Sequence, residues 1–428
     1  MARKMKDSGI EWIGKIPEGW EITKIKHIVS SVTDIDHFMP DSAEFGIPYL
    51  MISDLKDLSS SIDWDSSKKI SIEDYKKLSI KSRPQIGDII FARYASIGTT
   101  CYIDTDRDFL VSYACLTIHP SDLIIGKFLS YYLKSSSFAE DVLRRTNSNT
   151  QGNVGKDSLV NATIVLPSII EQTQIVNFLD AKCSDINAML SKTRSSIEEY
   201  KKLKQAVITQ AVTKGVRGER EMKDSGVEWI GKVPSKWNCI KIKYLFEIRK
   251  RIAGKEGYTV LSITQTGIKP KNISSNEGQL ADSYSNYQLL HFGEFAMNHM
   301  DLLTGWVDIS NYNGVTSPDY RVFSLKDTIT NHPRYFLYLM QMCYFNRIFY
   351  SMAQGVSNLG RWRLQSDKFL NCIFPVPSIE EQKEISDYLD TTCSEIDKLI
   401  AKKEQLVKEL ESYKKSLIYE VVTGKREV

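Results

Sequence analysis

Pro167-Ser168-Ile169-Ile170-Glu171-Gln172 opens a stretch that runs to Thr213 and decides the fold, because the chain contains this stretch twice. The second copy begins Pro377-Ser378-Ile379-Glu380-Glu381-Gln382, and the offset of 210 residues (377 − 167) holds without a gap. Each copy begins Ser-x-x-Glu, a motif in which the serine hydroxyl caps the N–H three residues on and the glutamate reaches back. The repeated motif therefore predicts the start of a helix at both places.

Both copies continue as long amphipathic patterns. In residues 186–211 and again in 396–421, mainly apolar positions recur at steps of three and four residues. Neither run contains Pro or Gly, and Gly215 and Gly424 stand where a helix would end. We therefore predict two long helices whose apolar stripes pack against each other as an antiparallel coiled coil. The alternative is that each helix packs on its own globular domain.

A second phrase is also duplicated. Lys-Asp-Ser-Gly-x-Glu-Trp-Ile-Gly-Lys-x-Pro at residues 6–17 returns at 223–234, an offset of 217 residues (223 − 6), and a second tryptophan follows each copy. The order of phrase, variable body and helix thus occurs twice. The chain is a tandem duplication, and antiparallel packing of the helices would relate its halves by a pseudo-two-fold axis. The segment after the second helix should then lie near the first phrase.

The two bodies predict an α+β fold class. Each mixes short β-branched and aromatic runs with Gly/Asp turns, which is typical of strands and hairpins. Each also carries one amphipathic segment, 126–145 or 334–352, that predicts a helix. The predicted regions are the first phrase (1–17), the first body (18–166), the first helix region (167–217), the second phrase (218–234), the second body (235–376) and the second helix region (377–428).

The composition is that of ordinary globular protein. With 42% apolar and 25% charged residues in 428, two to four compact units are expected. The net charge of +3 is too small to indicate a nucleic-acid partner, so such a site must come from local patches. We find neither a signal-peptide pattern nor an apolar run long enough to span a membrane. Seven cysteines without a Cys-x-x-Cys pair indicate reduced thiols in a cytoplasmic protein.

The sequence lacks the common catalytic motifs. It contains no Gly-x-x-x-x-Gly-Lys-Ser/Thr phosphate loop, no His-Glu-x-x-His and no Gly-x-Ser-x-Gly. The six histidines are scattered without metal-ligand spacing. These features favour a binding protein over an enzyme, with no cofactor or metal of its own.

Polar segments in corresponding places of the two bodies are the candidates for contact with nucleic acid. Arg matches the guanine edge and Asn or Gln the adenine edge, and nearby Arg or Lys would bind phosphates. The alternative is a solvated turn, since Asn, Ser and Gly are also turn residues. The candidates in the first body are Arg93, Tyr94, Ser96, Arg144, Arg145, Asn147, Asn149 and Gln151, and those in the second are Asn298, His299, Gln354, Ser357, Asn358, Arg361 and Arg363.

With these features the chain resembles the specificity subunits of Type I restriction–modification systems. The resemblance covers essentially all 428 residues. It is carried by Trp-x-Gly-x-x-Pro-x-x-Trp at 12–20 and 229–237, Pro-Ser-x-x-Glu-Gln-x-x-Ile at 167–175 and 377–385, and Gly-Asp-Ile-Ile-Phe at 87–91. In the second body, Gly-Glu-Phe-Ala at 293–296 departs from the last of these patterns.

The resemblance implies a non-catalytic DNA-binding subunit. Each body would be a target-recognition domain for one half of a split double-stranded DNA sequence. The helices would set the gap between the halves and dock methyltransferase subunits, usually two, and a motor-nuclease subunit would join for cleavage. S-adenosylmethionine would then belong to the methyltransferase, and ATP and magnesium to the motor.

Two other functions compete with this one. The chain could be a coiled-coil scaffold that presents two protein-binding heads without recognising DNA. A self-contained nuclease is less well supported, because the sequence shows no acidic metal cluster.

Overall fold

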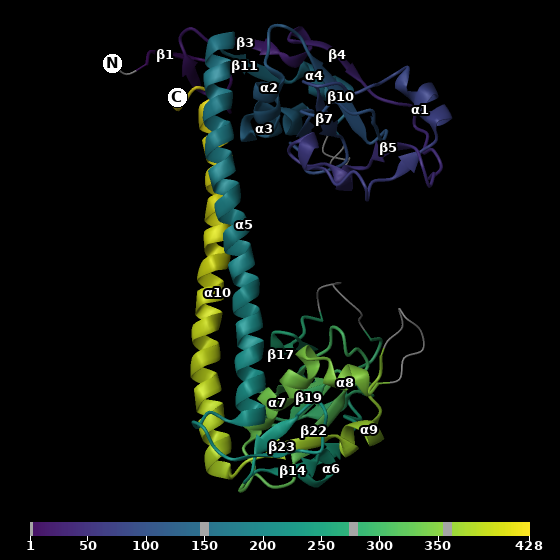
Figure 1. The fold of residues 1–428 in the computed structure, drawn as a ribbon, viewed down its shortest axis with the longest axis vertical. Helices are drawn as coiled ribbons and strands as arrows, with labels where there is room; N and C mark the ends of the chain where they lie inside the picture. Colours follow the sequence, from purple (N-terminus) through teal and green to yellow (C-terminus); the bar gives the residue numbers. More distant parts are fainter. Residues whose placement is uncertain (1–2, 146–153, 274–280, 354–361) are drawn as a thin grey trace. The chain divides into compact units, whose positions relative to one another are not determined.

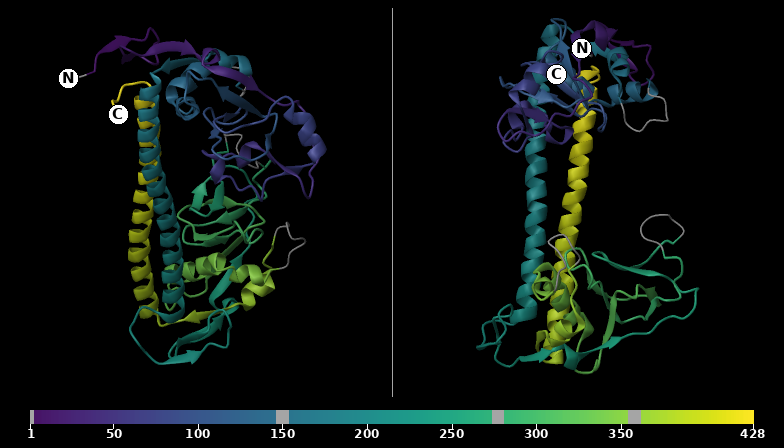
Figure 2. Two further views of the ribbon diagram at one scale, coloured as in Figure 1. Left: turned by 45° about the horizontal axis from the view of Figure 1, so that its top comes forward. Right: turned by 90° about the vertical axis from the view of Figure 1, so that its right-hand side faces the viewer.

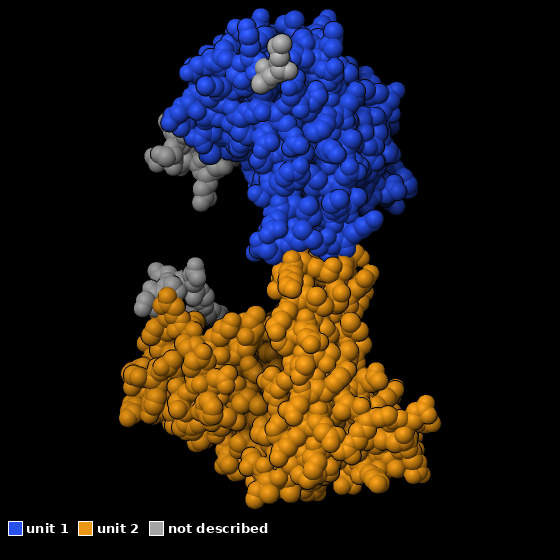
Figure 3. Space-filling model, turned by 90° about the vertical axis from the view of Figure 1, so that its left-hand side faces the viewer, with its two compact units in different colours: residues 1–194, 405–428 blue, residues 195–404 orange. Residues whose placement is uncertain are grey.

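A computed structural model describes residues 3–145, 154–273, 281–353 and 362–428 (Figure 1). The chain divides into two compact units (Figure 3). Unit 1 consists of Met1–Arg194 and Gln405–Val428, and unit 2 consists of Ser195–Glu404. The division passes through both long helices, so each unit holds one body, one phrase, the first part of one long helix and the last part of the other.

The two predicted long helices are present. Helix α5 spans Ile169–Lys214 (46 residues) and α10 spans Ile379–Val422 (44 residues). The hydroxyl of Ser168 accepts the Glu171 N–H at 3.4 Å, and the Glu171 carboxylate accepts the Ser168 N–H at 3.2 Å, so the predicted cap forms in both directions. Both helices end at a glycine with positive φ, 79° at Gly215 and 72° at Gly424, as predicted.

The helices run antiparallel to each other within each unit (Figures 1 and 2). In unit 1, Lys414 Nζ lies 2.9 Å from Asn187 Oδ1, and in unit 2, Lys204 Nζ lies 2.7 Å from Asp397 Oδ1. Seventeen residues forward along α5 (204 − 187) thus correspond to seventeen residues back along α10 (414 − 397). The same antiparallel register holds in both units, which confirms the coiled-coil prediction.

The end of α10 lies against the first phrase, as the duplication predicts. In unit 1 the phrase forms an antiparallel hairpin of β1 (Met5–Asp7) and β2 (Lys15–Pro17). Lys425 Nζ donates to the Lys15 carbonyl at 3.1 Å, and the Tyr419 hydroxyl donates to the Trp12 carbonyl at 3.4 Å. In unit 2 the end of α5 continues through the chain into the matching hairpin of β12 (Met222–Asp224) and β13 (Lys232–Pro234).

A tryptophan after each hairpin is bonded to the start of the long helix. In unit 1, Trp20 Nε1 donates to Glu171 at 3.0 Å, and the guanidinium of Arg3 pairs with the same carboxylate and lies 5.1 Å from the tryptophan ring centre. In unit 2, Trp237, Glu381 and Arg220 repeat this arrangement, with distances of 3.0 Å for the hydrogen bond and 5.4 Å to the ring centre. We call this set the Trp–Glu–Arg cluster of each unit.

Each body is built on a four-stranded antiparallel sheet with the same strand order. In unit 1 the order is β4 (Val29–Thr33), β10 (Cys115–Pro120), β7 (Ile89–Ala92) and β8 (Thr100–Tyr102). In unit 2 it is β15 (Phe246–Arg249), β22 (Arg321–Leu325), β19 (Phe295–Met297) and β20 (Val307–Ile309). The prediction of an α+β fold is confirmed.

Smaller elements complete each body. Unit 1 adds β3 (Glu21–Lys24) paired with β11 (Thr163–Leu166), the strands β6 (Lys69–Ile70), β5 (Ile47–Leu50) and β9 (Leu110–Val111), and helices α1 (Ile72–Ser79) and α4 (Lys156–Asn161). Unit 2 adds the pairs β14 (Asn238–Lys241) with β23 (Ile373–Val376), β16 (Leu261–Thr264) with β17 (Gly267–Pro270), and β18 (Gln288–Leu290) with β21 (Gly314–Thr316), together with α6 (Ile242–Leu245) and α9 (Ser366–Asn371).

The amphipathic segment of each body forms two helices, where one was predicted. In unit 1, α2 (Gly126–Leu133) and α3 (Ser136–Arg145) are separated because the Ser135 hydroxyl accepts the Phe138 N–H at 3.3 Å and starts a new helix. In unit 2, α7 (Pro333–Phe345) and α8 (Ile348–Ser351) are separated by Arg347, whose φ of 57° is left-handed. The prediction of a single helix in each segment was wrong.

The same polar contacts hold each body on the helix that follows it. In unit 1, Asp180 of α5 accepts from Lys127 and from the Tyr131 hydroxyl, both at 2.7 Å. In unit 2, Asp390 of α10 pairs with Arg334 at 2.7 Å and accepts from the Tyr338 hydroxyl. The duplication therefore includes the way each domain is mounted, and not only the helix sequences.

Candidate nucleic-acid interface

The central strand of each sheet starts from the same turn. Gly87 and Gly293 have positive φ values of 93° and 81°, a conformation that favours glycine. The acidic side chain after each glycine accepts a hydrogen bond from the main-chain N–H three residues before it. The Gln85 N–H donates to Asp88 at 2.7 Å, and the His291 N–H donates to Glu294 at 2.9 Å. The strands β7 and β19 therefore correspond residue by residue, despite the different sequence of the second.

This correspondence makes Arg93 and His299 equivalent. The carbonyl of each accepts a hydrogen bond from the main chain that follows a predicted polar loop. The Val154 N–H donates to the Arg93 carbonyl at 3.0 Å, and the Leu364 N–H donates to the His299 carbonyl at 3.0 Å. Two candidate segments that are about sixty residues apart in each body thus lie side by side. We call this place the loop edge: residues 93–99 and 154 in unit 1, and residues 298–306, 321 and 362–364 in unit 2.

Seven candidates lie outside the described residues, and the predictions for them stay predictions. They are Asn147, Asn149 and Gln151 in the first body, and Gln354, Ser357, Asn358 and Arg361 in the second.

In unit 1 the loop edge carries an arginine with an acidic partner. Arg93 lies 3.3 Å from Asp34 Oδ2, and its guanidinium carbon lies 5.6 Å from the centre of the Tyr94 ring. Tyr94 is 46% exposed. Ser96 is exposed, and its carbonyl accepts the Thr99 N–H at 3.0 Å, so Ser96 also forms the turn between β7 and β8.

The two arginines at the end of α3 have partners within the fold. Arg144 donates to Glu140 at 2.9 Å and lies 4.7 Å from the centre of the Trp12 ring, and its hydrogen bond with Glu140 raises its pKa. Arg145 donates at 2.9 Å to Asp141, which is 1% exposed. Arg145 therefore neutralises a buried carboxylate, and Arg144 covers the first phrase. These contacts favour a structural role for both side chains over a base contact.

In unit 2 the predicted residues that follow β19 are buried in the fold or bonded to neighbouring segments. The Asn298 side chain accepts the Met300 N–H at 3.2 Å, and its carbonyl accepts the Tyr344 hydroxyl at 2.8 Å. His299 is 7% exposed, and burial, together with the positive charges of Arg321 and Arg363, lowers its pKa to about 3. A neutral and buried ring is poorly placed to touch a base edge, so the structure argues against direct contact by His299.

Sequence reasoning missed Arg321, which begins β22. Its side chain is 3% exposed, donates to the Leu364 carbonyl at 2.9 Å and to the Ser366 hydroxyl at 3.3 Å, and lies 4.6 Å from the Phe369 ring centre. The one available signal was an arginine at the head of an apolar run, which sequence alone does not distinguish from a strand end in solvent. Arg363, a predicted candidate, is exposed nearby.

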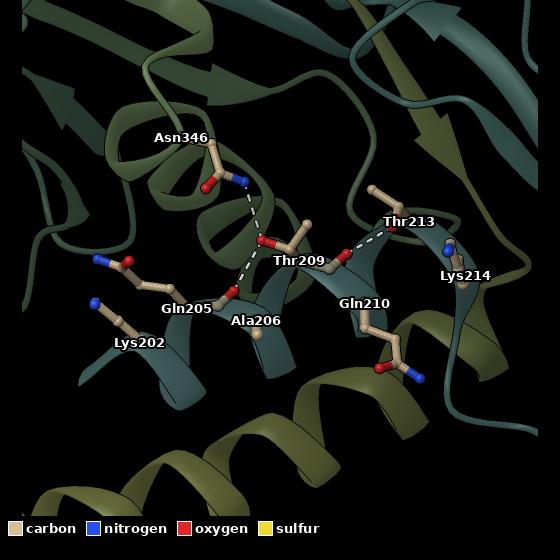
Figure 4. A pocket seen from close by; sticks show the side chains of 8 residues that line it. All are labelled: Lys202, Gln205, Ala206, Thr209, Gln210, Thr213, Lys214 and Asn346. Carbon is tan, nitrogen blue, oxygen red and sulfur yellow. Dashed lines mark hydrogen bonds between the residues drawn. The ribbon is translucent and has the colours of Figure 1, made fainter. Parts of the chain in front are cut away.

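A polar groove lies on α5 in unit 2, away from the loop edge (Figure 4). Its volume is about 410 Å³, and the Asn346 side chain donates to the Thr209 hydroxyl in it at 3.0 Å. Tyr419 of α10 occupies the position that matches Thr209 (419 − 209 = 210). The lining residues are Lys202, Gln205, Ala206, Thr209, Gln210, Thr213, Lys214 and Asn346.

The described part of the chain contains neither a metal-binding cluster nor a membrane-spanning helix. Over residues 3–145, 154–273, 281–353 and 362–428, no group of three or more His, Cys, Asp or Glu side chains could hold a metal ion. Within the same ranges, no helix is both long and apolar enough to cross a membrane.

Comparison with known sequences gives matches along the whole chain. The family model described as Type I restriction modification DNA specificity domain matches residues 17–199 and 234–409. The MjaVIII specificity subunit of a type I restriction enzyme from Methanocaldococcus jannaschii is 22% identical, and the alignment covers 96% of this chain and 94% of that protein. A protein of the same organism, named as the MjaX specificity subunit, is 28% identical over 239 residues, about half of either chain.

Solved structures share the fold at low sequence identity. One chain of a type I R-M system, studied for its complex assembly and conformational transition, has a TM-score of 0.70 at 15% identity, with 96% of this chain and 99% of that chain covered. The HsdS subunit from Thermoanaerobacter tengcongensis has a TM-score of 0.50 at 14% identity, with 96% and 98% covered.

Proposed function

We propose, since this chain belongs to the family of type I restriction–modification DNA specificity proteins, that it selects the DNA target of such a system. In this proposal residues 18–166 and 235–376 are the two target-recognition domains, and each recognises one half of a split double-stranded sequence. The chain itself catalyses neither methylation nor cleavage. It works in the cytoplasm, where both the DNA and the partner subunits are found.

The observation that carries the proposal is the loop edge. In both units the end of the central strand and the main chain after a polar segment are joined by one hydrogen bond of 3.0 Å. The frame is the same in both units, whereas the side chains on it differ: Arg93 and Tyr94 in one, Asn298 and Arg363 in the other. Equal frames with unequal polar side chains are what two modules need to recognise two different short sequences.

The long helices have two proposed roles. Helices α5 and α10 both pass through unit 1 and unit 2. We therefore propose that they set the number of unread base pairs between the two half-sites. Their solvent-facing sides are proposed to dock methyltransferase subunits, two in the assembled enzyme, and motor-nuclease subunits would join that assembly. The polar groove on α5 belongs to this part of the surface.

Selection of DNA from a random library tests the proposal. The full chain, purified with the methyltransferase subunit of its system, is mixed with random duplexes, and the retained DNA is sequenced. We expect two short defined blocks separated by a constant number of undefined base pairs. A single block, or retention without any sequence preference, would contradict the proposal.

The same experiment decides against the rival function. A scaffold that only presents protein-binding heads would leave the retained DNA indistinguishable from the DNA retained by the partner alone. The family match favours DNA recognition over this scaffold.

A further inference from the structure

Unit 2 contains a buried positive charge that has no acidic partner among the described residues. The Arg321 guanidinium is bonded to a carbonyl and a hydroxyl, and among the residues that the structure describes, neither Arg321 nor Arg363 forms an ion pair with a carboxylate. The sequence of residues 354–361 contains no Asp or Glu either. A buried charge is costly unless an opposite charge lies close to it, so this site favours the approach of an anion.

A second arginine, Arg363, adds positive charge close to Arg321. Burial is the main reason that its pKa falls to about 10, and the positive charge of Arg363 lowers it further, against the opposing effect of the Tyr344 hydroxyl. The buried ring of His299 responds to the same two arginines. Its Nδ1 is buried without a hydrogen-bond partner among the described residues. Two arginines and a histidine thus converge on the loop edge of unit 2. The one acidic residue within its bounds, Asp301, accepts hydrogen bonds from Leu303 and Thr304 of its own loop.

In the described part of unit 1, the matched place has no such excess of positive charge. On the sheet, Arg321 pairs with Met297 of β19, and the equivalent pair of unit 1 is Leu116 with Phe91. An apolar side chain therefore replaces the buried arginine. The remaining cation of that loop edge, Arg93, already has Asp34 as an acidic partner at 3.3 Å.

The geometry favours a phosphate over a base as the anionic group. Arg321 is 3% exposed and its donors are directed at Leu364 and Ser366, so it cannot present a two-pronged contact to a guanine. Its charge can still act at a distance through the low-dielectric interior. Arg363 is exposed beside it and can touch a phosphate directly.

We infer that the loop edge of unit 2 binds a backbone phosphate of the DNA, which Arg363 contacts while Arg321 supplies a second charge and holds the Leu364 main chain. This inference rests on the proposed function. It makes unit 2 the domain that anchors DNA of any sequence, while unit 1 depends more on direct contacts with bases.

Salt dependence tests the inference. The full chain with its methyltransferase partner is titrated with a random-sequence duplex and with its selected target at several salt concentrations, for wild type, Arg363→Gln and Arg363→Lys. Arg217→Gln is the matched control, because Arg217 lies in the same unit but is ion-paired with Glu384 at 2.7 Å, away from the loop edge. We expect Arg363→Gln to flatten the slope of log affinity against log salt by about 0.9, equally on both duplexes.

The conservative variant separates a phosphate from a base. Lysine can replace arginine at a phosphate but not at a two-pronged base contact, so Arg363→Lys should keep both the slope and the target preference. An unchanged slope in Arg363→Gln would overturn the inference, as would a changed second half-site in either variant. Because Arg363 is exposed, its loss does not threaten folding. If wild type shows no split target at all, the proposed function fails instead, which is seen before any variant is measured.

Discussion

The frame of the molecule is alike in its two halves, whereas the two loop edges differ. The Trp–Glu–Arg clusters are alike in both units, with Trp–Glu hydrogen bonds of 3.0 Å, and aspartates 180 and 390 mount the two bodies in the same way. At the loop edges, by contrast, unit 1 has an arginine neutralised by Asp34, and unit 2 has two arginines without an acidic partner among the described residues. The side chains thus diverge where a target would be recognised, while the contacts that mount each body on its helix are kept.

Lengthening the frame should have the largest effect. Seven residues inserted into α5 after Lys192 and seven into α10 after Glu409, which lies opposite in the antiparallel register, would preserve the apolar stripe. The helices become longer by about 10 Å, or roughly three base pairs of DNA. We expect the defined blocks of the selected DNA to move apart by that amount, with loss of most specific binding to the original target. Substitution of the same residues without insertion is the control, and an unchanged gap would show that the helices do not set it.

Removing the acid of a Trp–Glu–Arg cluster tests the frame in each unit. Glu381 is 7% exposed in its side chain and bonds both Trp237 and Arg220, so Glu381→Ala leaves the partly buried guanidinium of Arg220 without its acidic partner and an indole N–H unpaired. We expect a loss of about 3–5 kcal/mol from the free energy of unfolding. Glu171→Ala is the matched change in unit 1, where the side chain is 30% exposed, and should cost about 1–2 kcal/mol. If urea unfolding showed the same loss of unfolding free energy for both variants, the different burial of the two glutamates would not affect stability.

Truncation of Arg93 sharpens the comparison on the side of unit 1. The proposal gives Arg93 a contact with the first half-site, in exchange for its bond to Asp34. Arg93→Ala should weaken binding by about 1–3 kcal/mol and relax the first block of the selected DNA only. Asp34→Asn retains the arginine and serves as the control. Relaxation of the second block, or no change in either, would remove Arg93 from the interface.

His299 should make unit 2 sensitive to acid. Its pKa is about 3 in the folded chain and near 6.5 in the unfolded chain. Below pH 6.5 the imidazole is therefore protonated in the unfolded state but stays neutral in the folded state. The free energy of unfolding should therefore fall as the pH is lowered from 6.5 to 5. Relative to His299→Gln, wild type should lose about 1–2 kcal/mol over this range. Parallel pH profiles for the two proteins would contradict the burial of a neutral histidine beside two arginines.

The frame was predictable because its sequence cues are local. The Ser-x-x-Glu starts, the apolar stripes and the glycine ends each depend on residues within a few turns, and the duplication showed which segments belong together. The same local reasoning failed at Ser135, because a serine inside an amphipathic pattern can either stay in the helix or start a new one.

The loop edges were only partly predictable. Their polar residues were found from composition and repetition, but their convergence depends on the strand order, which brings Val154 to Arg93 and Leu364 to His299. Arg321 is placed by the pairing of β22 with β19, whereas His299 is buried in the segment that follows β19. Neither a short strand nor the segment after it reveals which side chains will face the interior, so His299 was predicted as a candidate contact from its residue type and position, and Arg321 went unnoticed.

Exchange of one body is the most direct test of two independent recognition domains on a common frame. Residues 18–166 are replaced by the corresponding body of a family member with a different target, and the bound DNA is selected and sequenced again. The account predicts that the first block changes to the donor's sequence while the second block and the gap stay as they were. A change in both blocks, or in neither, would contradict it.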